Sequence, residues 1–408
     1  MQNTIFANEH LNMQIADRVH SINEPQTIAM AKLSRELAAQ GYDVISLSLG
    51  EPDFVTPEHI MQAAKEALDK GFTFYTPVAG IPQLREAVCE KLKRENGLTY
   101  SPEQIVVSTG AKHSIMNVIM ATINPGDEVI IPTPYWVSYS EMVKLMGGVP
   151  VFIHAGVEQN YKINATQLQA AITPKTKAFM FSSPCNPTGS VYSKQELAEL
   201  VNVFAQHEHI LVMSDEIYEH INFVGKHESI AAFDVIKDRV VVVNGMSKGY
   251  AMTGWRIGYI AAPLEISKAC EKIQGQYTSG TNVIAQHASV AALTGTQQPT
   301  EHMRLAYARR RDLVIKGLQE IEGLVCNTPE GAFYAFPDIS SFLGKQYAGK
   351  TIHTATDLCL YLLNEVHVSM VTGEAFGAPT CIRISYATSD EKLLEALKRI
   401  KKGLTQLQ

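Results

Sequence analysis

The stretch RVVVVNGMSKGYAMTGWR, residues 239–256, decides the fold of this 408-residue chain. It contains four consecutive valines, and such a run is typical of a strand buried on both faces of a sheet. In open α/β sheets, ligands bind outside the carboxyl ends of the strands. The residues after the valines, among them Ser247, Lys248 and Arg256, therefore fall where such a sheet has its ligand crevice. The stretch predicts a buried strand that ends at a binding site.

Six further runs of the same kind lie elsewhere in the chain, separated by helical patterns. They are rich in β-branched and apolar residues and span 104–108, 128–131, 149–154, 178–182, 210–214 and 258–262. Near-continuous apolar strands separated by helices suit a mostly parallel sheet covered on both faces. We therefore predict an α/β fold, in which a large domain has a mostly parallel seven-stranded sheet between helices.

The pattern changes after residue 300, where longer helices and fewer strands are expected. Helical periodicity covers 303–318, 354–366 and 390–407, and a strand is expected over 381–385. Near the N-terminus, a helix over 27–40 ends at Gly41 and a short strand follows over 44–49. We predict a large domain at 46–300, a smaller α+β domain at 301–408, and an N-terminal segment, 1–45, that joins the small domain.

Composition and charge limit the class of protein. The net charge is −6, and no basic run is interleaved with aromatic residues, so a nucleic-acid partner is not expected. The longest basic cluster, Arg309 to Arg311, is expected on a solvated helix face. Neither a secretory signal nor an apolar run long enough to span a membrane is recognisable. We expect a soluble, cytoplasmic protein without a membrane partner.

Cysteine and histidine spacing gives no sign of a metal site. The six cysteines are scattered without a CxxC pair, and they are expected to be reduced and structural. No HExxH motif is present. Four histidines lie in polar, loop-like sequence and are expected at the surface: His207, His209, His220 and His227.

Several residue types suited to one cofactor follow the predicted strands. Gly110 and Ala111 open a helix, where backbone N–H groups can bind a phosphate, although such turns are also common in purely structural roles. Trp136 offers a face that can stack on a flat heterocycle, or it packs in the core. Asn186 is held in the rigid turn 183–189, where its amide can donate to a phenolate oxygen.

The next two strand ends carry the residues with the most specific chemistry. Asp215 can pair with a protonated pyridine nitrogen, or it caps the next helix, and Tyr218 can bind the phenolic oxygen of the same ring. A lysine such as Lys248 is by itself most often a solvated surface charge, but it can form a Schiff base with an aldehyde. Arg256 offers a planar fork for a phosphate. Together these residues indicate pyridoxal 5'-phosphate (PLP).

These motifs resemble the fold type I PLP-dependent aminotransferases (class I/II), and within them the bacterial aspartate aminotransferase subgroup. The resemblance rests on SPCNPTG at 183–189, DEIY at 215–218 and SKGYAMTGWRIGY at 247–259, in this order. It extends over essentially the whole chain, from LGEPDF at 49–54 to CIRISY at 381–386. Two departures from the family pattern are Cys185, where serine is common, and Gly245, where other subgroups often place a hydroxyl.

The resemblance implies a role for each site residue. Lys248 holds the cofactor and moves the proton at the substrate α-carbon, with Asp215 and Tyr218 as the other catalytic residues. The cofactor-binding set implied is Lys248, Gly110, Ala111, Trp136, Asn186, Asp215, Tyr218, Ser247, Arg256 and Tyr75. Tyr75 would reach the phosphate of the neighbouring subunit, which implies a homodimer with shared active sites.

The resemblance also implies the substrates, which are amino acids and 2-oxo acids. Arg383 would bind the α-carboxylate together with the N–H of Gly50, and Trp136 and Asn186 would line the substrate site. Lys112 would bind a second carboxylate, with a hydrogen bond from Thr27. L-aspartate and 2-oxoglutarate are therefore the expected substrates. The alternatives are aromatic amino acids, kynurenine or prephenate, a carbon–sulfur lyase of the same fold, or a PLP-binding regulator that is not an enzyme.

Overall fold

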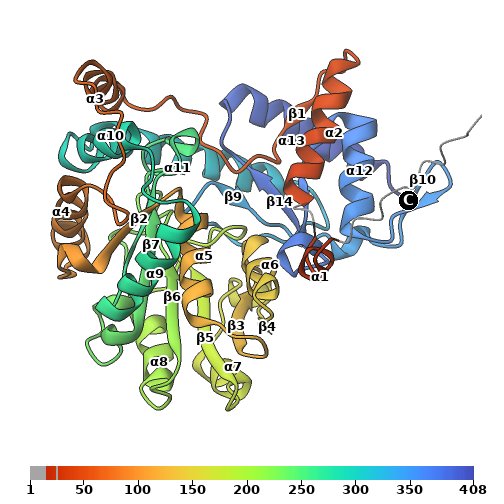
Figure 1. Cartoon of the computed structure of the whole chain (residues 1–408). Coiled ribbons are helices and arrows are strands. Elements are labelled where there is room, and N and C mark those ends of the chain that lie inside the picture. Colours follow the sequence, from red (N-terminus) through yellow and green to blue (C-terminus); the bar gives the residue numbers. More distant parts are fainter. Residues whose placement is uncertain (1–14, 24–25) are drawn as a thin grey trace, which may run out of the picture.

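The computed structural model of the chain describes residues 15–23 and 26–408. Its largest sheet has seven strands in the order β2-β8-β7-β6-β5-β3-β4 (Figure 1). The strands are β2 (Ile105–Ser108), β3 (Glu128–Thr133), β4 (Val149–His154), β5 (Thr176–Ser182), β6 (Leu211–Asp215), β7 (Val240–Gly245) and β8 (Gly258–Ala261). Strand β8 is antiparallel to both of its neighbours, and the other strand pairs are parallel. The predicted mostly parallel seven-stranded sheet is confirmed.

The four valines of β7 explain why the sheet is covered on both faces. Successive side chains of a strand point to opposite faces. Val240 and Val242 pack in one hydrophobic cluster, Val241 and Val243 pack in another, and all four are 0% exposed. Burial of apolar surface on both faces is the main stabilising term for such a sheet.

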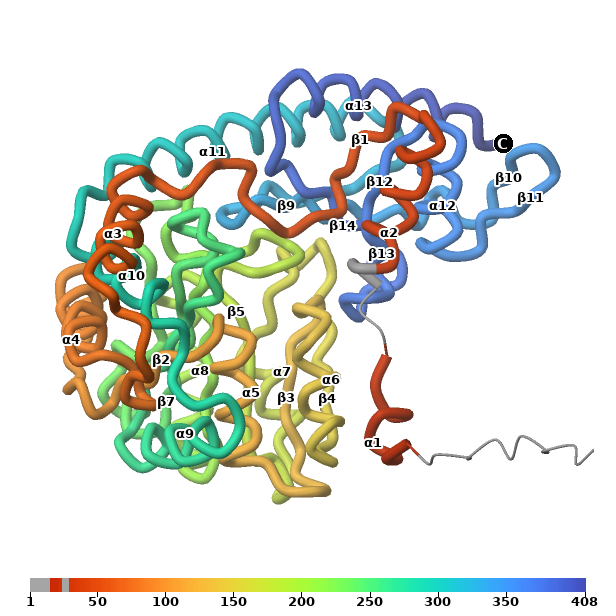
Figure 2. Tube along the Cα trace, turned by 45° about the horizontal axis from the view of Figure 1, so that its top comes forward, coloured from red at the N-terminus to blue at the C-terminus, as the bar shows by residue number. Residues whose placement is uncertain are grey.

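Helices cover the two faces separately (Figure 2). One cluster contains residues of α4 (Pro82–Lys91), α8 (Lys194–Phe204) and α10 (Val283–Thr294). The other contains residues of α5 (Ala111–Thr122), α6 (Ser138–Leu145) and α9 (Leu264–Tyr277). The remaining helices of this region are α3 (Glu58–Asp69) and α7 (Ala165–Ala171). Because every parallel strand runs in the same direction, the loops after these strands meet at one edge of the sheet.

A second core is built around a three-stranded antiparallel sheet, β13-β14-β9. Its strands are β13 (Val371–Thr372), β14 (Ile382–Ser385) and β9 (Tyr334–Ala335). Three C-terminal helices contribute many of the buried residues of this core: α11 (Gln298–Gln319), α12 (Ala355–Val366) and α13 (Asp390–Thr405).

The N-terminal part of the chain joins this second core. Strand β1 (Ile45–Ser46) pairs in parallel with β12 (Val368–Ser369), and Met30 of α2 (Gln26–Ala39) and Ile45 are buried in the same cluster. The division of the chain at residues 45 and 300 stays a proposal. The strand expected over 44–49 is shorter than predicted because β12 offers it only two paired residues.

Two expectations about charged residues are wrong. Arg310 is not on a solvated face: it is 7% exposed and forms ion pairs with Asp53 and Asp390. His227 is not at the surface either: it is 8% exposed, and its Nε2 lies 3.0 Å from a carboxylate oxygen of Glu216. Both side chains are buried because a carboxylate replaces the water they lose.

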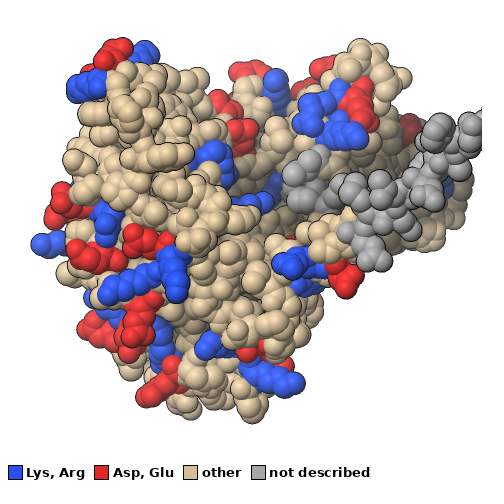
Figure 3. Space-filling model, viewed as in Figure 1, with Lys and Arg blue, Asp and Glu red and all other residues tan. Residues whose placement is uncertain are grey.

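The surface carries charges of both signs. Lys and Arg side chains are interspersed with Asp and Glu over the face seen in Figure 3. Within residues 15–23 and 26–408, no helix combines the length and the apolar character that a membrane crossing requires.

Candidate active site

The main candidate site is a cavity of about 400 Å³ at the carboxyl edge of the large sheet, facing the small sheet. Residues from both sheets line it: Leu49, Gly50, Glu51, Ala111, Lys112, Trp136, Tyr139, Ser182, Asn186, Asp215, Ile217, Tyr218, Ser247, Lys248, Thr253, Arg256, Tyr334 and Arg383. Most of the residues predicted from the sequence are therefore brought together in one cavity. The topology of the sheet brings these residues together, because β5, β6 and β7 all end at this cavity.

Lys248 lies in the floor of the cavity, three residues after β7. Its Nζ donates a hydrogen bond to the backbone oxygen of Gly50 at 2.5 Å. Burial, and next the positive charge of Arg383, lower the pKa of Lys248 to about 8. A lowered pKa leaves a larger share of the amine neutral near pH 7, which is the form that reacts with an aldehyde.

Asp215 is the last residue of β6 and is 6% exposed. Burial raises the pKa of its carboxyl to about 6. Two donors partly oppose this: the Tyr139 hydroxyl lies 2.6 Å from Oδ2, and the Ile217 N–H lies 3.2 Å from Oδ1. Asp215 has two donors and, among the described residues, no ion-pair partner, so a protonated ring nitrogen suits it as a partner.

Asn186, Tyr218 and Arg383 lie close together on the small-sheet side. One Arg383 nitrogen, Nη1, donates to the Oδ1 of Asn186 at 3.0 Å, and Nη2 donates to the backbone oxygen of Ser48 at 2.7 Å. The hydroxyls of Tyr218 and Tyr334 are 2.7 Å apart. Two buried polar atoms of the cavity wall, Arg383 Nε and Ser182 Oγ, have no hydrogen-bond partner among the described residues. Such atoms favour a polar ligand in the cavity.

The predicted phosphate end is formed where α5 begins. Gly110 has φ +85°, and a Cβ there would overlap the guanidinium of Arg256. A Cβ on Gly258 would overlap the backbone nitrogen of Ala111. Arg256 donates from Nη1 to the backbone oxygen of Thr253 at 2.9 Å, and from Nη2 to the backbone oxygen of Thr109 at 3.4 Å, just before the helix start. The small residues thus let an arginine approach a helix N-terminus, as an anion site requires.

Lys112 and Trp136 form the outer wall of the cavity. The Nζ of Lys112 lies 4.9 Å from the centre of the Trp136 ring. Partial burial, and next the charge of Arg256, lower the pKa of Lys112. The cavity therefore has one positive group at its outer wall, Lys112, and another, Arg383, on its small-sheet side.

Taken together, the residues present fit PLP. The cavity offers an amine with a lowered pKa, a buried carboxyl with a raised pKa, hydroxyl and amide groups, an aromatic face and a small-residue cradle beside an arginine. Each of these groups matches a different part of that cofactor.

Two predicted residues, Gly110 and Tyr75, do not line the cavity, although Gly110 directly precedes Ala111, which does. Tyr75 is 97% exposed on this chain. The side chain of Thr27 lies outside the described part of the structure. Cys185 lies beside the site, and its thiol is 3.7 Å from the backbone oxygen of Pro134.

Two tyrosines of the cavity, Tyr139 and Tyr334, were not predicted from the sequence. Tyr139 lies on the first turn of α6, three residues after Trp136, and this spacing places it on the same side of the turn. Tyr334 belongs to the two-residue strand β9, and its place beside the cavity depends on the pairing of β9 with β14 in the small sheet. The sequence therefore carries a signal for the first residue and none for the second.

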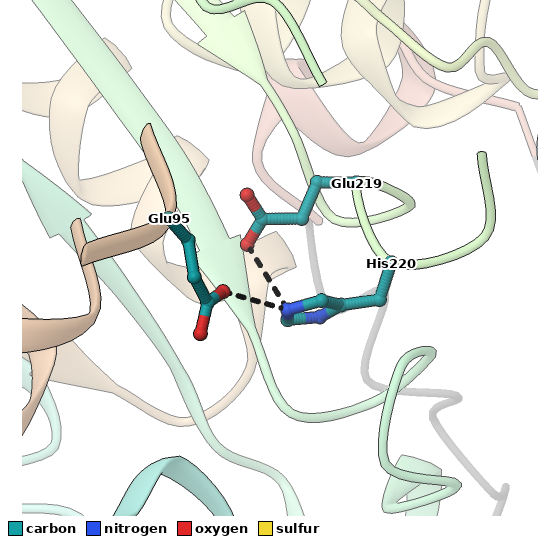
Figure 4. A group of neighbouring side chains, drawn as sticks. All are labelled: Glu95, Glu219 and His220. Atoms are coloured by element: carbon teal, nitrogen blue, oxygen red, sulfur yellow. Dashed lines mark hydrogen bonds and ion pairs between the residues drawn. The ribbon is translucent and has the colours of Figure 1, made fainter. Parts of the chain in front are cut away.

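A buried ion network lies behind the site. Glu219 follows Tyr218 directly, and His220 points its Nε2 between the carboxylates of Glu95 and Glu219 (Figure 4). Lys91, 0% exposed, forms an ion pair with Glu219 and a hydrogen bond of 2.9 Å with Asn96. Burial raises the pKa of Glu219, but the charges of Lys91, His220 and His227, together with the Lys91 hydrogen bond, outweigh burial and lower the pKa. The network anchors the segment that carries Asp215 and Tyr218.

Comparison with known proteins gives the family. The model of the family described as aminotransferase class I and II matches residues 42–400. The aspartate/prephenate aminotransferase of Cereibacter sphaeroides is 50% identical over 389 residues, which are 95% of this chain and 97% of that relative. The aspartate aminotransferase of Geobacillus stearothermophilus is 46% identical over 391 residues, 95% of this chain and 98% of that relative.

A solved structure agrees with the sequence relatives. The crystal structure of the aspartate aminotransferase from Rhizobium meliloti has a TM-score of 0.94 and 45% sequence identity, and the alignment covers 97% of this chain and 100% of that chain. The fold class predicted from the sequence and the resemblance to aminotransferases are both confirmed. This chain belongs to the class I and II aminotransferase family.

Proposed function

We propose that this protein is a PLP-dependent aspartate aminotransferase, which converts L-aspartate and 2-oxoglutarate to oxaloacetate and L-glutamate. The observation that carries the proposal is the content of one cavity. Lys248 and Asp215 lie in it with pKa values moved toward each other by burial, and Arg383 and Lys112 supply two cations for a dicarboxylate.

The cofactor and the residues of this chain have separate tasks. PLP, when bound, withdraws electrons from the substrate α-carbon and carries the amino group from one acid to the other. Lys248 holds it covalently and, once released, moves the proton at the α-carbon. Asp215 keeps the ring nitrogen protonated, and the Tyr139 hydroxyl keeps Asp215 oriented. Asn186 and Tyr218 bind the ring oxygen, and Trp136 stacks on the ring.

The phosphate and the substrate are bound at different ends of the cavity. Ser247, Arg256 and the N–H groups of Gly110 and Ala111 form the phosphate cradle in this proposal. Arg383 binds the α-carboxylate with its planar fork, which fixes the bond at the α-carbon that is broken. Lys112 binds the side-chain carboxylate of aspartate.

We also propose that the enzyme is a homodimer with shared active sites. Phe74 and Tyr75 are 83% and 97% exposed, and adjacent aromatic residues this exposed are typical of a surface that a partner covers. In the proposed dimer, Tyr75 binds the phosphate in the partner subunit's cavity.

Prephenate is the second candidate substrate. Two relatives that are 50% and 49% identical are named as aspartate/prephenate aminotransferases, one of them as probable. Prephenate also carries two carboxylates, so it can use the same pair of cations. Steady-state kcat/KM values distinguish these substrates. Aspartate and phenylalanine are compared with the same amino-group acceptor, and prephenate is measured with one fixed amino-group donor.

The same assay tests the proposal itself. Aspartate with 2-oxoglutarate is expected to be among the best pairs, and Lys248→Ala is expected to lower kcat by at least about a thousandfold because it removes the covalent anchor and the proton carrier. Lys70→Ala, an exposed lysine of the same charge, is the control. A wild-type enzyme that uses phenylalanine well and ignores aspartate, or an active Lys248→Ala variant, contradicts the proposal.

A further inference from the structure

Tyr334 makes two contacts in the cavity wall, each with a residue that has a different task. Its side chain is 0% exposed, and its hydroxyl lies 2.7 Å from the hydroxyl of Tyr218. Its ring lies beneath the guanidinium of Arg383, with 4.5 Å between Cζ and the ring centre. One residue of the small sheet thus touches both the tyrosine proposed for the ring oxygen and the arginine proposed for the α-carboxylate.

The hydroxyl pair restricts where its two protons point. Each tyrosine hydroxyl has one proton, so only one of the two protons lies between the oxygens. Among the described residues, the Tyr334 hydroxyl has Tyr218 as its only hydrogen-bond partner. If Tyr334 donates to Tyr218, the Tyr218 proton is free to point into the cavity. If Tyr218 donates to Tyr334, that proton is used and the ring oxygen loses a donor.

The ring of Tyr334 restricts the plane of Arg383. The guanidinium lies between Tyr334 and Phe376, whose ring centres are 4.5 Å and 5.0 Å from Cζ. Its two terminal nitrogens are held by Asn186 and the backbone of Ser48. Aromatic faces on a guanidinium favour a flat, stacked orientation and leave its edge free for a carboxylate.

The space around the Tyr334 hydroxyl is matched to it. A Cβ added to Gly50 would lie 2.7 Å from this oxygen, so the glycine leaves just the room that the hydroxyl fills. Gly50 is also the residue whose backbone oxygen accepts the hydrogen bond from Lys248.

We propose that Tyr334 is a positioning residue with two separable parts: its hydroxyl directs the Tyr218 proton to the ring oxygen, and its ring sets the plane of Arg383 for the substrate carboxylate. The inference rests on the proposed function, because it needs a ring oxygen at Tyr218 and a carboxylate at Arg383. Removing the hydroxyl alone therefore affects the cofactor end, and removing the ring affects the carboxylate end.

The first experiment measures the pH midpoint of the visible absorbance band of the purified PLP-loaded enzyme. A hydrogen bond donated to an anionic oxygen stabilises its charged form. Tyr334→Phe keeps Tyr218 as the donor but removes the hydrogen bond that directs and polarises its hydroxyl, so the ring oxygen is stabilised less and protonation beside it becomes easier. Tyr334→Phe is expected to raise the midpoint by roughly half a pH unit. The charged groups around Lys248, namely Arg383, Glu51, Arg256 and Asp215, are unchanged in this variant.

Two further variants show whether Tyr334 acts through Tyr218. Tyr386→Phe removes another hydroxyl from a 0% exposed tyrosine of the same core, one that is bonded to a backbone oxygen, and it is expected to leave the midpoint unchanged. In a Tyr218→Phe background, Tyr334→Phe is expected to cause no additional shift, because the group it directs is gone.

The second experiment measures binding of succinate, a dicarboxylate without an amino group, by calorimetry on the same enzymes. Tyr334→Phe keeps the ring and is expected to keep the dissociation constant within about twofold, whereas Tyr334→Leu is expected to raise it roughly tenfold. If Tyr334→Leu does not fold, the midpoint of Tyr334→Phe decides the inference alone.

The outcomes separate this inference from the proposed function. A wild-type protein that shows no visible band with PLP overturns both. A wild-type enzyme with the band and an unshifted Tyr334→Phe variant overturns the inference only. Equal shifts in Tyr334→Phe and Tyr386→Phe, or additive shifts in the double variant with Tyr218→Phe, also overturn it, because they indicate a general structural effect.

Discussion

Burial acts in opposite directions on the two ionisable residues in the floor of the cavity. It lowers the pKa of Lys248 to about 8 and raises the pKa of Asp215 to about 6. In water the two values are separated by more than about six units, because the free side chains titrate near 10.4 and 3.9. The protein therefore brings both pKa values close to neutral pH, so that either group can change its charge when a ligand arrives. This arrangement suits a cofactor that brings an aldehyde to Lys248 and a basic nitrogen to Asp215.

The Tyr139 hydroxyl is expected to strengthen the pairing of Asp215 with that nitrogen. Tyr139→Phe removes a 2.6 Å hydrogen bond to Oδ2, which stabilises the charged carboxylate. The loss of one hydrogen bond to a charged group corresponds to about 1.5 kcal/mol, so the dissociation constant of PLP should rise roughly tenfold. Fluorescence titration of the cofactor-free enzyme with PLP measures it.

Tyr135, in the loop just before α6, provides the control for this variant. Tyr135→Phe removes a hydroxyl bonded to Ser140 at 3.0 Å, and Tyr135 does not line the cavity. Its PLP affinity should match that of the wild type. Unchanged PLP affinity in Tyr139→Phe would show that the pairing of Asp215 with the ring nitrogen does not depend on the Tyr139 hydroxyl.

Lys112 is expected to decide the preference for a dicarboxylate. Lys112→Ala should raise the KM for aspartate roughly tenfold or more and leave the value for phenylalanine nearly unchanged, because only aspartate has a carboxylate to lose a charged partner. Lys144→Ala, on α6 and paired with Glu141, is the matched control. Equal changes for the two amino acids would remove Lys112 from substrate recognition.

Helices and strands differ in how well their position and packing partners can be predicted from the sequence. The seven strands of the large sheet were predicted within a few residues, because six of them are apolar runs that are largely buried and the edge strand β4, although partly exposed, is also apolar and rich in valine and isoleucine. Strand β9, which pairs with β14, was not predicted, because two residues are too few to show the alternation of a strand. Tyr334 was overlooked as a site residue for this reason.

Helix α11 shows the same limit for charged residues. Its three consecutive arginines share one sequence pattern, yet Arg309 has a side chain 64% exposed and Arg310 one only 9% exposed. The difference comes from Asp53, which a distant segment brings to Arg310. Ion pairs between residues this far apart in the chain cannot be predicted from the local sequence.

The two arginines therefore differ in their predicted contribution to stability. Arg310→Ala leaves Asp53 without its partner, and it should lower the free energy of unfolding by about 2 kcal/mol. Arg309→Ala removes an exposed pair with Asp390 and should cost less than about 1 kcal/mol. Urea unfolding of both variants measures the difference, and equal losses would contradict the distinction.

At the scale of the whole molecule, the site exists only where the two cores meet. Asp215 ends strand β6 of the large sheet and Lys248 follows strand β7, whereas Arg383 and Tyr334 belong to the small sheet. The strand-end residues could be predicted because the topology of a parallel sheet gathers them at one edge. The contacts across the cavity, such as Arg383 with Asn186 and Tyr334 with Tyr218, depend on how the two cores pack, and no local pattern of residues indicates them.

Asp215 should also make the stability of the cofactor-free protein depend on pH. Its pKa is about 6 in the folded protein against an ordinary value of 3.8, so between these values the folded state binds more protons than the unfolded chain. The free energy of unfolding therefore falls as the pH rises from about 4 to about 6, by up to about 3 kcal/mol, and the penalty persists above pH 6.

The comparison with Asp215→Asn isolates this carboxyl, because all other titrating groups are common to both proteins. Relative to that variant, the wild type should lose stability across the stated range in urea unfolding at fixed pH. If the difference in the free energy of unfolding between the wild type and Asp215→Asn stays constant from about pH 4 to about pH 6, burial does not hold Asp215 in its protonated form.

The most direct test of the central claim is the visible spectrum of the purified PLP-loaded enzyme, recorded before and after L-aspartate is added without a 2-oxo acid. The visible band should disappear stoichiometrically, and 2-oxoglutarate should restore it. This reversible half-reaction requires Lys248, Asp215 and the two carboxylate-binding cations to act in one cavity. A band that is present but does not respond to aspartate would contradict aspartate as the substrate, and a protein that stays colourless with PLP would contradict every role proposed for Lys248 and its neighbours.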